Sequence, residues 1–376
     1  QPNTIFGGES PDYPASAIAN TNKAMKIKEV RRLILDGIDF EQYNQTNTNT
    51  EDIHQYQLNT LTPPGYVFDE NDKDYLEYYY EEYAENKGLE NGEAAKALIG
   101  PQKIEGVNYS DAEVLTMRAE AADAVAQYNA LNPTDPITLP IIVENAGLAG
   151  YAVSAATSEA RWINNFNARV NAGLGEGNEF LTLVNNIKAT TSDKASTNAY
   201  AAYYTLNTWG WIGDYADPLT YLHTYVTNGD MSLFTGTKAA RDNYYLNASD
   251  ELVYEADGLL EDYDELVDDA KAITSSNDRR YDAFAEAEYE LINNVYIIKP
   301  HSMNSQGWAV SVSRAIGYEN PTASYGLADY RLTGMWVLVE PPTGAERQVA
   351  RDLQSQKKAV ALAETGIYNY LGSDEE

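Results

Sequence analysis

The sequence predicts an α/β protein built from two lobes. The chain has 376 residues, which exceeds the roughly 100 to 200 residues of an ordinary domain. A short apolar run at 137–143 precedes a helical pattern at 154–174, and a second short strand pattern follows near 179–187. Strand, helix and strand in this order are typical of an α/β unit. We therefore expect strands and helices to alternate in each lobe.

Composition excludes several classes of function. Hydrophobic residues make up 43% and charged residues 22% of the chain, which is typical of a globular protein. The net charge of -31 would repel nucleic acid and anionic lipid, so neither is expected as a partner. The chain has no cysteine, and its three histidines lie far apart in the sequence. We therefore expect no metal site and no cofactor.

Tyrosine dominates the aromatic residues, with 30 tyrosines against 7 phenylalanines. Such a surplus indicates aromatic surface that is hydrogen-bonded to water or to a ligand. A compositional habit of the organism is the alternative.

Helical patterns recur along the chain, separated by polar tracts and turns. Ser110 is followed by Asp111 and Glu113, as in the first turn of a capped helix. We expect a polar loop at 42–51 and a strand at 295–298 that ends before Pro300. The predicted helices cover residues 23–40, 74–86, 110–128, 154–174, 251–269, 279–294 and 346–370.

The segment WGWIGDYADP at 209–218 carries most of the functional information. Apolar and small residues alternate from 201 to 212, and Gly210 and Gly213 bracket Trp211. Glycine within a strand pattern marks the close approach of another backbone. The pattern suits a strand edge on which an extended peptide would pair, with indole rings lining pockets for its side chains.

Two aspartates in this segment have different expected roles. Asp217 precedes Pro218, which predicts a helix N-cap followed by the first helical residue. Asp214 lies at the end of the glycine-bracketed strand, where a carboxylate is placed to meet a cation. A charge-assisted hydrogen bond to a ligand ammonium contributes roughly 1.5–3 kcal/mol. The alternative for Asp214 is an ordinary surface position in a loop.

The stretch WGWIGDYADPLTYL resembles the motif of family 5 solute-binding proteins, the oligopeptide and dipeptide receptors of bacterial ABC importers. Three further stretches resemble this family: VRRLILDGIDFEQY at 30–43, TPPGYVFD at 62–69 and the helix-and-strand pattern at 280–300. The resemblance implies a periplasmic-binding-protein-like (type II, cluster C) fold. In that fold two α/β lobes joined by crossing strands close on the ligand like a hinge.

The resemblance also implies a ligand site. Asp214 matches the aspartate that binds the α-ammonium of a peptide, and Gly210, Trp211 and Ile212 match the strand that pairs with its backbone. Trp209 and Tyr215 complete the expected ligand-binding residues, and no catalytic residue is expected.

The same resemblance predicts how the chain is divided. Residues 1–22 would be a remnant of lobe one, residues 23–300 the second, peptide-binding lobe, and residues 301–376 a return to lobe one. Most of the N-terminal lobe and the lipobox cysteine would then be missing, so we expect weak or no affinity for ligand. An acidic stretch near 88–113 is an insertion relative to the family pattern.

The expected function is the extracellular substrate-binding component of an ABC transporter. It would capture oligopeptides as a monomer and deliver them to permease subunits. It would be a cell-surface lipoprotein or a periplasmic protein, touching the membrane only through a lipid anchor that this chain lacks. Residues 1–13 show no signal-peptide pattern, which predicts a cytoplasmic protein or a chain that begins after processing.

Three alternatives remain open. A carbohydrate-active enzyme would use Asp214 and Asp217 as paired carboxylates, although a capping role for Asp217 counts against this. A surface adhesin or signalling receptor would use the same fold. Within the family the ligand is not always a peptide, since some members bind sugars or nickel complexes.

Overall fold

The structure of the chain is a computed structural model. It describes residues 15–47, 58–90, 92–96, 109–145, 153–185, 205–206, 210–231 and 259–301, together with the isolated residues 343, 345, 349 and 356. The predicted helix at 346–370 falls almost entirely outside these ranges. The proposed boundaries of lobe one at 22 and 300 stay predictions.

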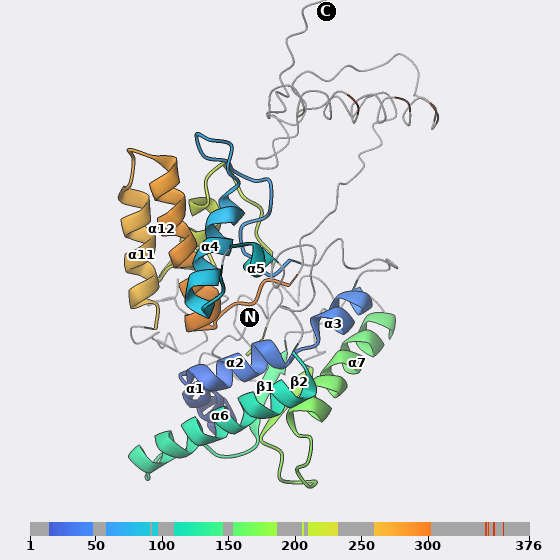
Figure 1. The fold of residues 1–376 in the computed structure, drawn as a ribbon. Coiled ribbons are helices and arrows are strands. Elements are labelled where there is room, and N and C mark those ends of the chain that lie inside the picture. The colour runs from blue at the N-terminus through green and yellow to red at the C-terminus, as the bar shows by residue number, and fades with distance from the viewer. Residues whose placement is uncertain are drawn as a thin grey trace, which may run out of the picture.

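Helices predominate in the described residues (Figure 1). The elements are α1 (Ala15–Met25), α2 (Lys28–Gly37), α3 (Phe40–Asn47), α4 (Tyr75–Lys87), α5 (Gly92–Lys96), α6 (Asp111–Leu131), β1 (Ile141–Asn145), α7 (Val153–Val170), β2 (Leu181–Asn185), α9 (Leu219–Leu222), the 3₁₀ turn η2 (His223–Tyr225), α11 (Glu261–Ala272), α12 (Asn277–Tyr289) and the π-helical turn η3 (Glu290–Val295).

The predicted α/β unit is confirmed. β1 and β2 pair in parallel, with Ile141 opposite Leu181, and α7 forms the crossover between them. A parallel bridge from Leu206 to Asn145 extends the sheet on the other side of β1. The burial of Ile141, Val143, Leu181 and Leu183 explains why both strands read as apolar runs.

Two hydrophobic cores organise the described residues, and Figure 1 shows them one above the other. The sheet core lies among α1, α2, α3, α6, α7 and the two strands, and the helical core lies among α4, α9, α11, α12 and η3. The sheet core includes Val30, Leu33, Ile34, Val114, Met117, Ile141, Val143, Phe166 and Leu181. The helical core includes Tyr66, Tyr75, Leu76, Tyr79, Leu222, Tyr263, Phe284, Leu291 and Ile297.

Tyrosines fill much of the helical core, in contrast to the wet aromatic surface expected from composition. Tyr75, Tyr79 and Tyr263 are all buried, and each hydroxyl has a partner inside the protein. The Tyr263 hydroxyl donates to the Leu222 carbonyl at 2.6 Å, and the Tyr75 hydroxyl donates to the Glu288 carboxylate at 3.0 Å. Paired hydroxyls let tyrosine replace phenylalanine in a core at little cost.

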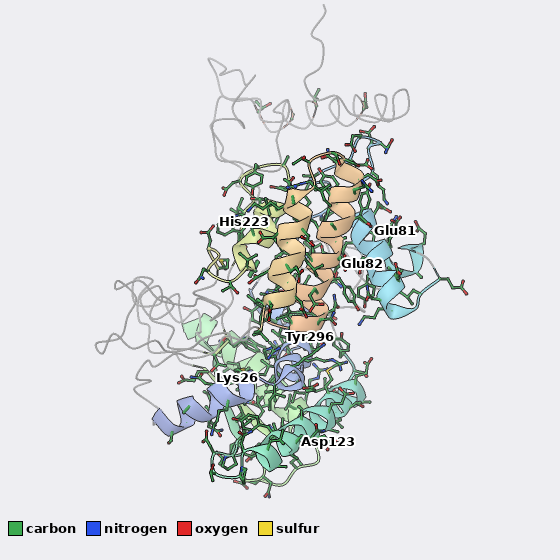
Figure 2. The ribbon with its side chains drawn as sticks, turned by 90° about the vertical axis from the view of Figure 1, so that its left-hand side faces the viewer. Lys26, Glu81, Glu82, Asp123, His223 and Tyr296 are labelled. Carbon is green, nitrogen blue, oxygen red and sulfur yellow. The ribbon has the colours of Figure 1, made fainter. Side chains whose placement is uncertain are left out.

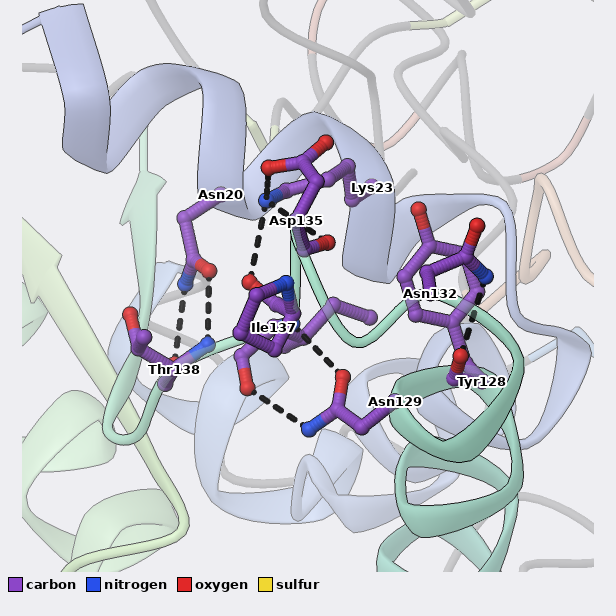
Figure 3. Close-up of polar contacts among 9 residues, drawn as sticks. Asn20, Lys23, Tyr128, Asn129, Asn132, Asp135, Ile137 and Thr138 are labelled. Carbon is purple, nitrogen blue, oxygen red and sulfur yellow. Dashed lines mark hydrogen bonds and ion pairs between the residues drawn. The ribbon is translucent and has the colours of Figure 1, made fainter.

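Asparagine side chains pair with backbone groups beside the sheet. The Asn20 amide accepts from the Thr138 N–H at 2.7 Å and donates to the Thr138 carbonyl at 2.9 Å. The Asn129 amide does the same with Ile137 (Figure 3). Because these side chains take the hydrogen bonds of residues 137 and 138, β1 begins at Ile141 and not at 137 as predicted.

The outer edge of β2 is closed in the same way. Asn167 in the last turn of α7 and Asn171 directly after its end donate to the carbonyls of Leu183 and Leu181, both at 2.8 Å. They accept from the N–H groups of Leu183 and Phe180 at 2.8 and 2.9 Å. On the opposite edge the Thr21 hydroxyl donates to the Ile142 carbonyl at 2.6 Å. The asparagines thus occupy the place of a neighbouring strand.

Most predicted helices are confirmed, and several boundaries are wrong. Ser110 forms a full capping box with Glu113, and α4 and α12 lie where the periodicity placed them. The predicted helix at 23–40 is broken at Ile27, which is extended, into α1 and α2. The predicted loop at 42–51 begins as α3, and the acidic helix starts at Glu261 within the described residues.

The predicted strand at 295–298 is wrong. η3 runs into an irregular segment in which Tyr296 has a left-handed φ of 54°. Val295, Ile297 and Ile298 belong to the helical core and Tyr296 to the sheet core. The segment is apolar because it passes between two cores and not because it lies in a sheet.

Candidate functional site

The segment at 209–218 is described from Gly210 onward, so Trp209 lies outside the described residues. Residues 210–212 form no strand, and the strand predicted at 201–212 is confirmed only at Leu206, within what the structure describes. The chain instead bends at residues 214–217, directly after Gly213, whose N–H donates to the Tyr221 hydroxyl at 3.3 Å. The backbone is fixed by side chains of the helical core and not by a strand.

The two glycines of the segment have different environments. A Cβ atom on Gly213 would lie 2.1 Å from the Tyr66 hydroxyl oxygen and 2.9 Å from Cγ2 of Thr220, so only glycine fits. A Cβ atom on Gly210 would meet nothing within 4 Å. Side chains of Tyr66 and Thr220, and not the predicted second backbone, approach Gly213 closely, and the space beside Gly210 is open.

The apolar side chains around these glycines point in different directions. Trp211 packs against the helical core, and its indole N–H is buried without a hydrogen-bond partner among the described residues. Ile212 and Tyr215 are 68% and 42% exposed. Partial burial first, and then the charges of Asp217 and Asp214, raise the pKa of the Tyr215 hydroxyl. Trp211 thus supports the segment from beneath, while Ile212 and Tyr215 face outward.

Asp214 is exposed, and its carboxylate has no partner in the part of the chain that the structure describes. Its backbone is nevertheless fixed, because its N–H donates to the Thr220 hydroxyl at 2.9 Å. The Tyr66 hydroxyl donates to the carbonyl of the next residue, Tyr215. An acceptor on a fixed backbone is free to bind a donor from outside.

Asp217 has the structural role that the sequence predicted. Its Oδ1 accepts from the N–H of Leu219, the first residue of α9, at 2.9 Å. The helix therefore begins one residue later than predicted, with Pro218 in the N-cap position. Its Oδ2 lies 2.9 Å from Nε of Arg280, and Oδ1 lies 3.2 Å from Nη2, so the ion pair is bidentate. Both carboxylate oxygens are therefore committed, and Asp217 is not available as the second member of a catalytic pair.

Arg280 and Tyr66 were not identified from the sequence, although both are central here. Arg280 also donates to the carbonyls of Ala270 and Ile273 at 3.1 Å, so it joins the end of α11 to the start of α9. Tyr66 packs edge-to-face on Tyr221, with ring centroids 5.1 Å apart. Tyr66 lies in TPPGYVFD and Arg280 begins the stretch at 280–300. Three of the four family-like stretches therefore meet at residues 210–218.

In the described residues no cluster of histidine and acidic side chains is arranged to hold a metal ion. No described helix is both long and apolar enough to cross a membrane.

Curated relatives come from streptococci. The chain is 24% identical over 322 residues to the oligopeptide-binding protein AliB of Streptococcus pneumoniae, covering 82% of this chain and 42% of AliB. The chain is therefore similar to curated oligopeptide-binding proteins. The oligopeptide-binding protein AliA of the same species is 25% identical over 293 residues, covering 74% of this chain and 39% of AliA. The chain spans about two fifths of the length of these relatives.

The resemblance that the four stretches predicted is thereby confirmed, and the predicted class, a periplasmic-binding-protein-like α/β fold, agrees with it. No model of a known protein family matches the chain. A solved structure of the substrate-binding domain of an oligopeptide ABC transporter from Bacillus anthracis str. Ames aligns with a TM-score of 0.47 and 16% identity. It covers 81% of this chain and 43% of that chain.

Proposed function

We propose that this chain binds oligopeptides as part of the extracellular substrate-binding component of an ABC importer, with Asp214 as the anchor for the ligand ammonium. The observation that carries the proposal is the contrast at residues 214–217. Asp217 is fully committed to a helix cap and an ion pair, while the Asp214 carboxylate is exposed and free of partners among the described residues.

Preorganisation supports the role of Asp214. The Thr220 hydroxyl holds its N–H, the Tyr66 hydroxyl holds the carbonyl of Tyr215, and Gly213 allows the close packing between them. Fixing an acceptor before the ligand arrives removes part of the entropy cost of binding. A charge-assisted hydrogen bond from an ammonium to such a carboxylate contributes roughly 1.5–3 kcal/mol.

Free backbone supports peptide pairing at 210–212. Within the described residues, no hydrogen bond uses the N–H or carbonyl groups of Gly210, Trp211 or Ile212. At the edges of the sheet, in contrast, Asn167, Asn171 and Thr21 occupy backbone groups of β2 and β1. An extended ligand would therefore meet unpaired backbone beside Gly210, where no described residue lies within 4 Å of the Cβ position.

The remaining parts of the proposal concern the whole protein. Residues 23–300 would form the peptide-binding lobe, with residues 1–22 and 301–376 belonging to lobe one, and the two lobes would close on the peptide. The protein would act outside the cell or in the periplasm as a monomeric lipoprotein, deliver peptide to permease subunits and catalyse no reaction. A surface adhesin or signalling receptor on the same fold is the competing assignment.

Calorimetry with free and N-acetylated peptides tests the anchor. In a protein that carries both lobes, Asp214→Asn should weaken binding of a free peptide by about tenfold, which corresponds to about 1.4 kcal/mol. N-acetylated peptides, which lack the ammonium, should bind the parent protein and the variant equally weakly. Asp268→Asn, at an exposed position on α11, is the matched control and should leave binding unchanged.

Two outcomes would count against the proposal. If acetylation leaves the affinity of the parent protein unchanged, the role given to Asp214 is wrong. If no peptide binds to a protein that carries both lobes, and none accompanies it through native purification in mass spectrometry, peptide capture itself is wrong.

A further inference from the structure

A fully buried carboxyl group belongs to Glu288, on the face of α12 that packs into the helical core. Its Oε1 accepts from the N–H groups of Leu61 at 2.6 Å and Thr62 at 3.2 Å. Its Oε2 accepts from the hydroxyls of Thr62 at 2.9 Å and Tyr75 at 3.0 Å. The carboxyl group thus fastens the irregular segment at 60–66 to α12, which lies 226 positions away from Thr62 in the sequence.

The helix that carries Glu288 lies between two parts of the helical core. α12 contacts α4, α9 and α11. Figure 2 shows α4, labelled at Glu81 and Glu82, and the turn after α9, labelled at His223, on opposite sides of the α11–α12 pair. No basic side chain forms an ion pair with Glu288 in the described part of the chain. After burial, the Glu288 charge also raises the pKa of tyrosines on each neighbouring helix: Tyr75, Tyr79 and Tyr80 on α4, Tyr221 on α9 and Tyr263 on α11.

The hydrogen-bond partners of Glu288 suit a neutral carboxyl group. Burial without a cation disfavours the charged form and raises the pKa from 4.5 to about 7, although the bonds from Thr62, Leu61 and Tyr75 lower it. Backbone N–H groups cannot accept a hydrogen bond, so the proton lies on Oε2, where the hydroxyls of Thr62 and Tyr75 can turn to accept it. Once this proton is lost, any opening that admits water to the carboxylate is favoured.

The segment at 60–66 also holds the candidate peptide site. The hydroxyl of Tyr66, its last residue, donates to the Tyr215 carbonyl and lies against Gly213. The Tyr66 ring packs edge-to-face on Tyr221, whose hydroxyl accepts from the Gly213 N–H. Loosening this segment therefore weakens the contacts that fix the peptide site.

We propose that Glu288 is a positioning residue: its neutral carboxyl group holds the segment at 60–66 against residues 213–215, and loss of the proton loosens both. Because the closed state holds this proton more tightly than an open state does, the site is firmest below pH 4.5 and loosens as pH rises through 7. The consequence for peptide capture rests on the proposed function, whereas the coupled loosening of the two segments does not. The two can therefore fail independently.

Amide hydrogen exchange read by mass spectrometry tests the coupling without any peptide. The parent protein and Glu288→Gln would be compared at about pH 5.5 and about pH 8, and the ratio of their rates at each pH cancels the intrinsic effect of pH on exchange. Glutamine copies the neutral carboxyl group, since its oxygen accepts from the backbone N–H groups and its amide donates to the hydroxyls. An opening that returns the pKa of Glu288 to 4.5 is favoured about 10-fold at the lower pH and about 300-fold at the higher pH, so the ratio should rise about 30-fold.

The rise should appear both at 58–66 and at 210–218, where the N–H groups of Gly213 and Asp214 are hydrogen-bonded and report on opening. Glu286→Gln, exposed on the same helix, removes the same charge and should give a ratio that does not change with pH. A constant ratio at 58–66 in Glu288→Gln would overturn the proposal, and so would a rise at 58–66 without one at 210–218. If both segments exchange only as slowly as α12 itself, the effect is global unfolding and the proposal is wrong.

A second variant tests the route between the two segments. Tyr66→Phe keeps the ring against Tyr221 but loses the hydroxyl that donates to Tyr215. Compared with the double variant Tyr66→Phe/Glu288→Gln, it should keep the pH response at 58–62 and lose it at 213–215. An undiminished response at 213–215 would overturn the route through Tyr66 and with it the positioning role of Glu288.

Discussion

Asp217→Asn should destabilise the protein far more than Asp214→Asn, although the two positions lie three residues apart. Asparagine can still accept from the Leu219 N–H, so the cap of α9 survives. Its amide cannot accept two hydrogen bonds from Arg280, and one of its N–H groups would face the guanidinium. Arg280 is only 13% exposed and would keep its charge while losing its counter-ion.

The magnitude follows from burial. Removing one partner of a fully buried ion pair costs about 3–5 kcal/mol. The side chain of Asp217 is 22% exposed, and Arg280 keeps its carbonyl acceptors on α11. We therefore expect Asp217→Asn to lower the free energy of unfolding by about 2–3 kcal/mol. Asp214→Asn removes no contact within the described residues and should change it by less than about 0.5 kcal/mol.

Urea unfolding followed by tryptophan fluorescence and circular dichroism measures both variants. Trp211 lies against the helical core, so its emission reports on the region that Asp217 stabilises. Equal midpoints for the two variants would refute the distinction between a structural and a ligand-binding aspartate. A large loss in Asp214→Asn would show that its carboxylate has a structural partner.

Other substitutions test the same reasoning. Gly213→Ala places a methyl group 2.1 Å from the Tyr66 oxygen and should cost about 1–3 kcal/mol in thermal unfolding. Gly210→Ala meets nothing within 4 Å, so it should leave stability nearly unchanged but weaken peptide binding in calorimetry. Burial raises the pKa of the Glu288 carboxyl from 4.5 to about 7. Because the folded state holds this proton more tightly, its contribution of about 3 kcal/mol should be present below pH 4.5 and lost as pH rises through 7, relative to Glu288→Gln. Parallel stability profiles for the parent and Glu288→Gln would contradict this shift.

Features that depend on local sequence could be predicted. The Ser110 capping box and the Asp217 cap are recognisable because a cap needs only residues within three positions of each other. The strand at 295–298 could not be predicted correctly, since an apolar run looks the same in a sheet and between two cores.

The residues that contact the candidate site could not be identified from local sequence patterns. Arg280 meets Asp217 across 63 positions of sequence, and Tyr66 meets the carbonyl of Tyr215 across 149. Arg280 and Tyr66 both lie in stretches that resemble the solute-binding family. The resemblance therefore indicated that these stretches matter, but it did not indicate which residues they contact. Packing in three dimensions alone decides which tyrosine faces which carbonyl.

The asparagines beside the sheet make the strands sensitive to a chemical change that most positions tolerate. Hydrolysis of the Asn171 amide would leave its size unchanged but replace the donor with a second acceptor. That acceptor would lie 2.8 Å from the Leu181 carbonyl, where two oxygens repel each other. The same holds for Asn167 at Leu183. The persistence of this sheet is therefore tied to the chemical lifetime of two side-chain amides.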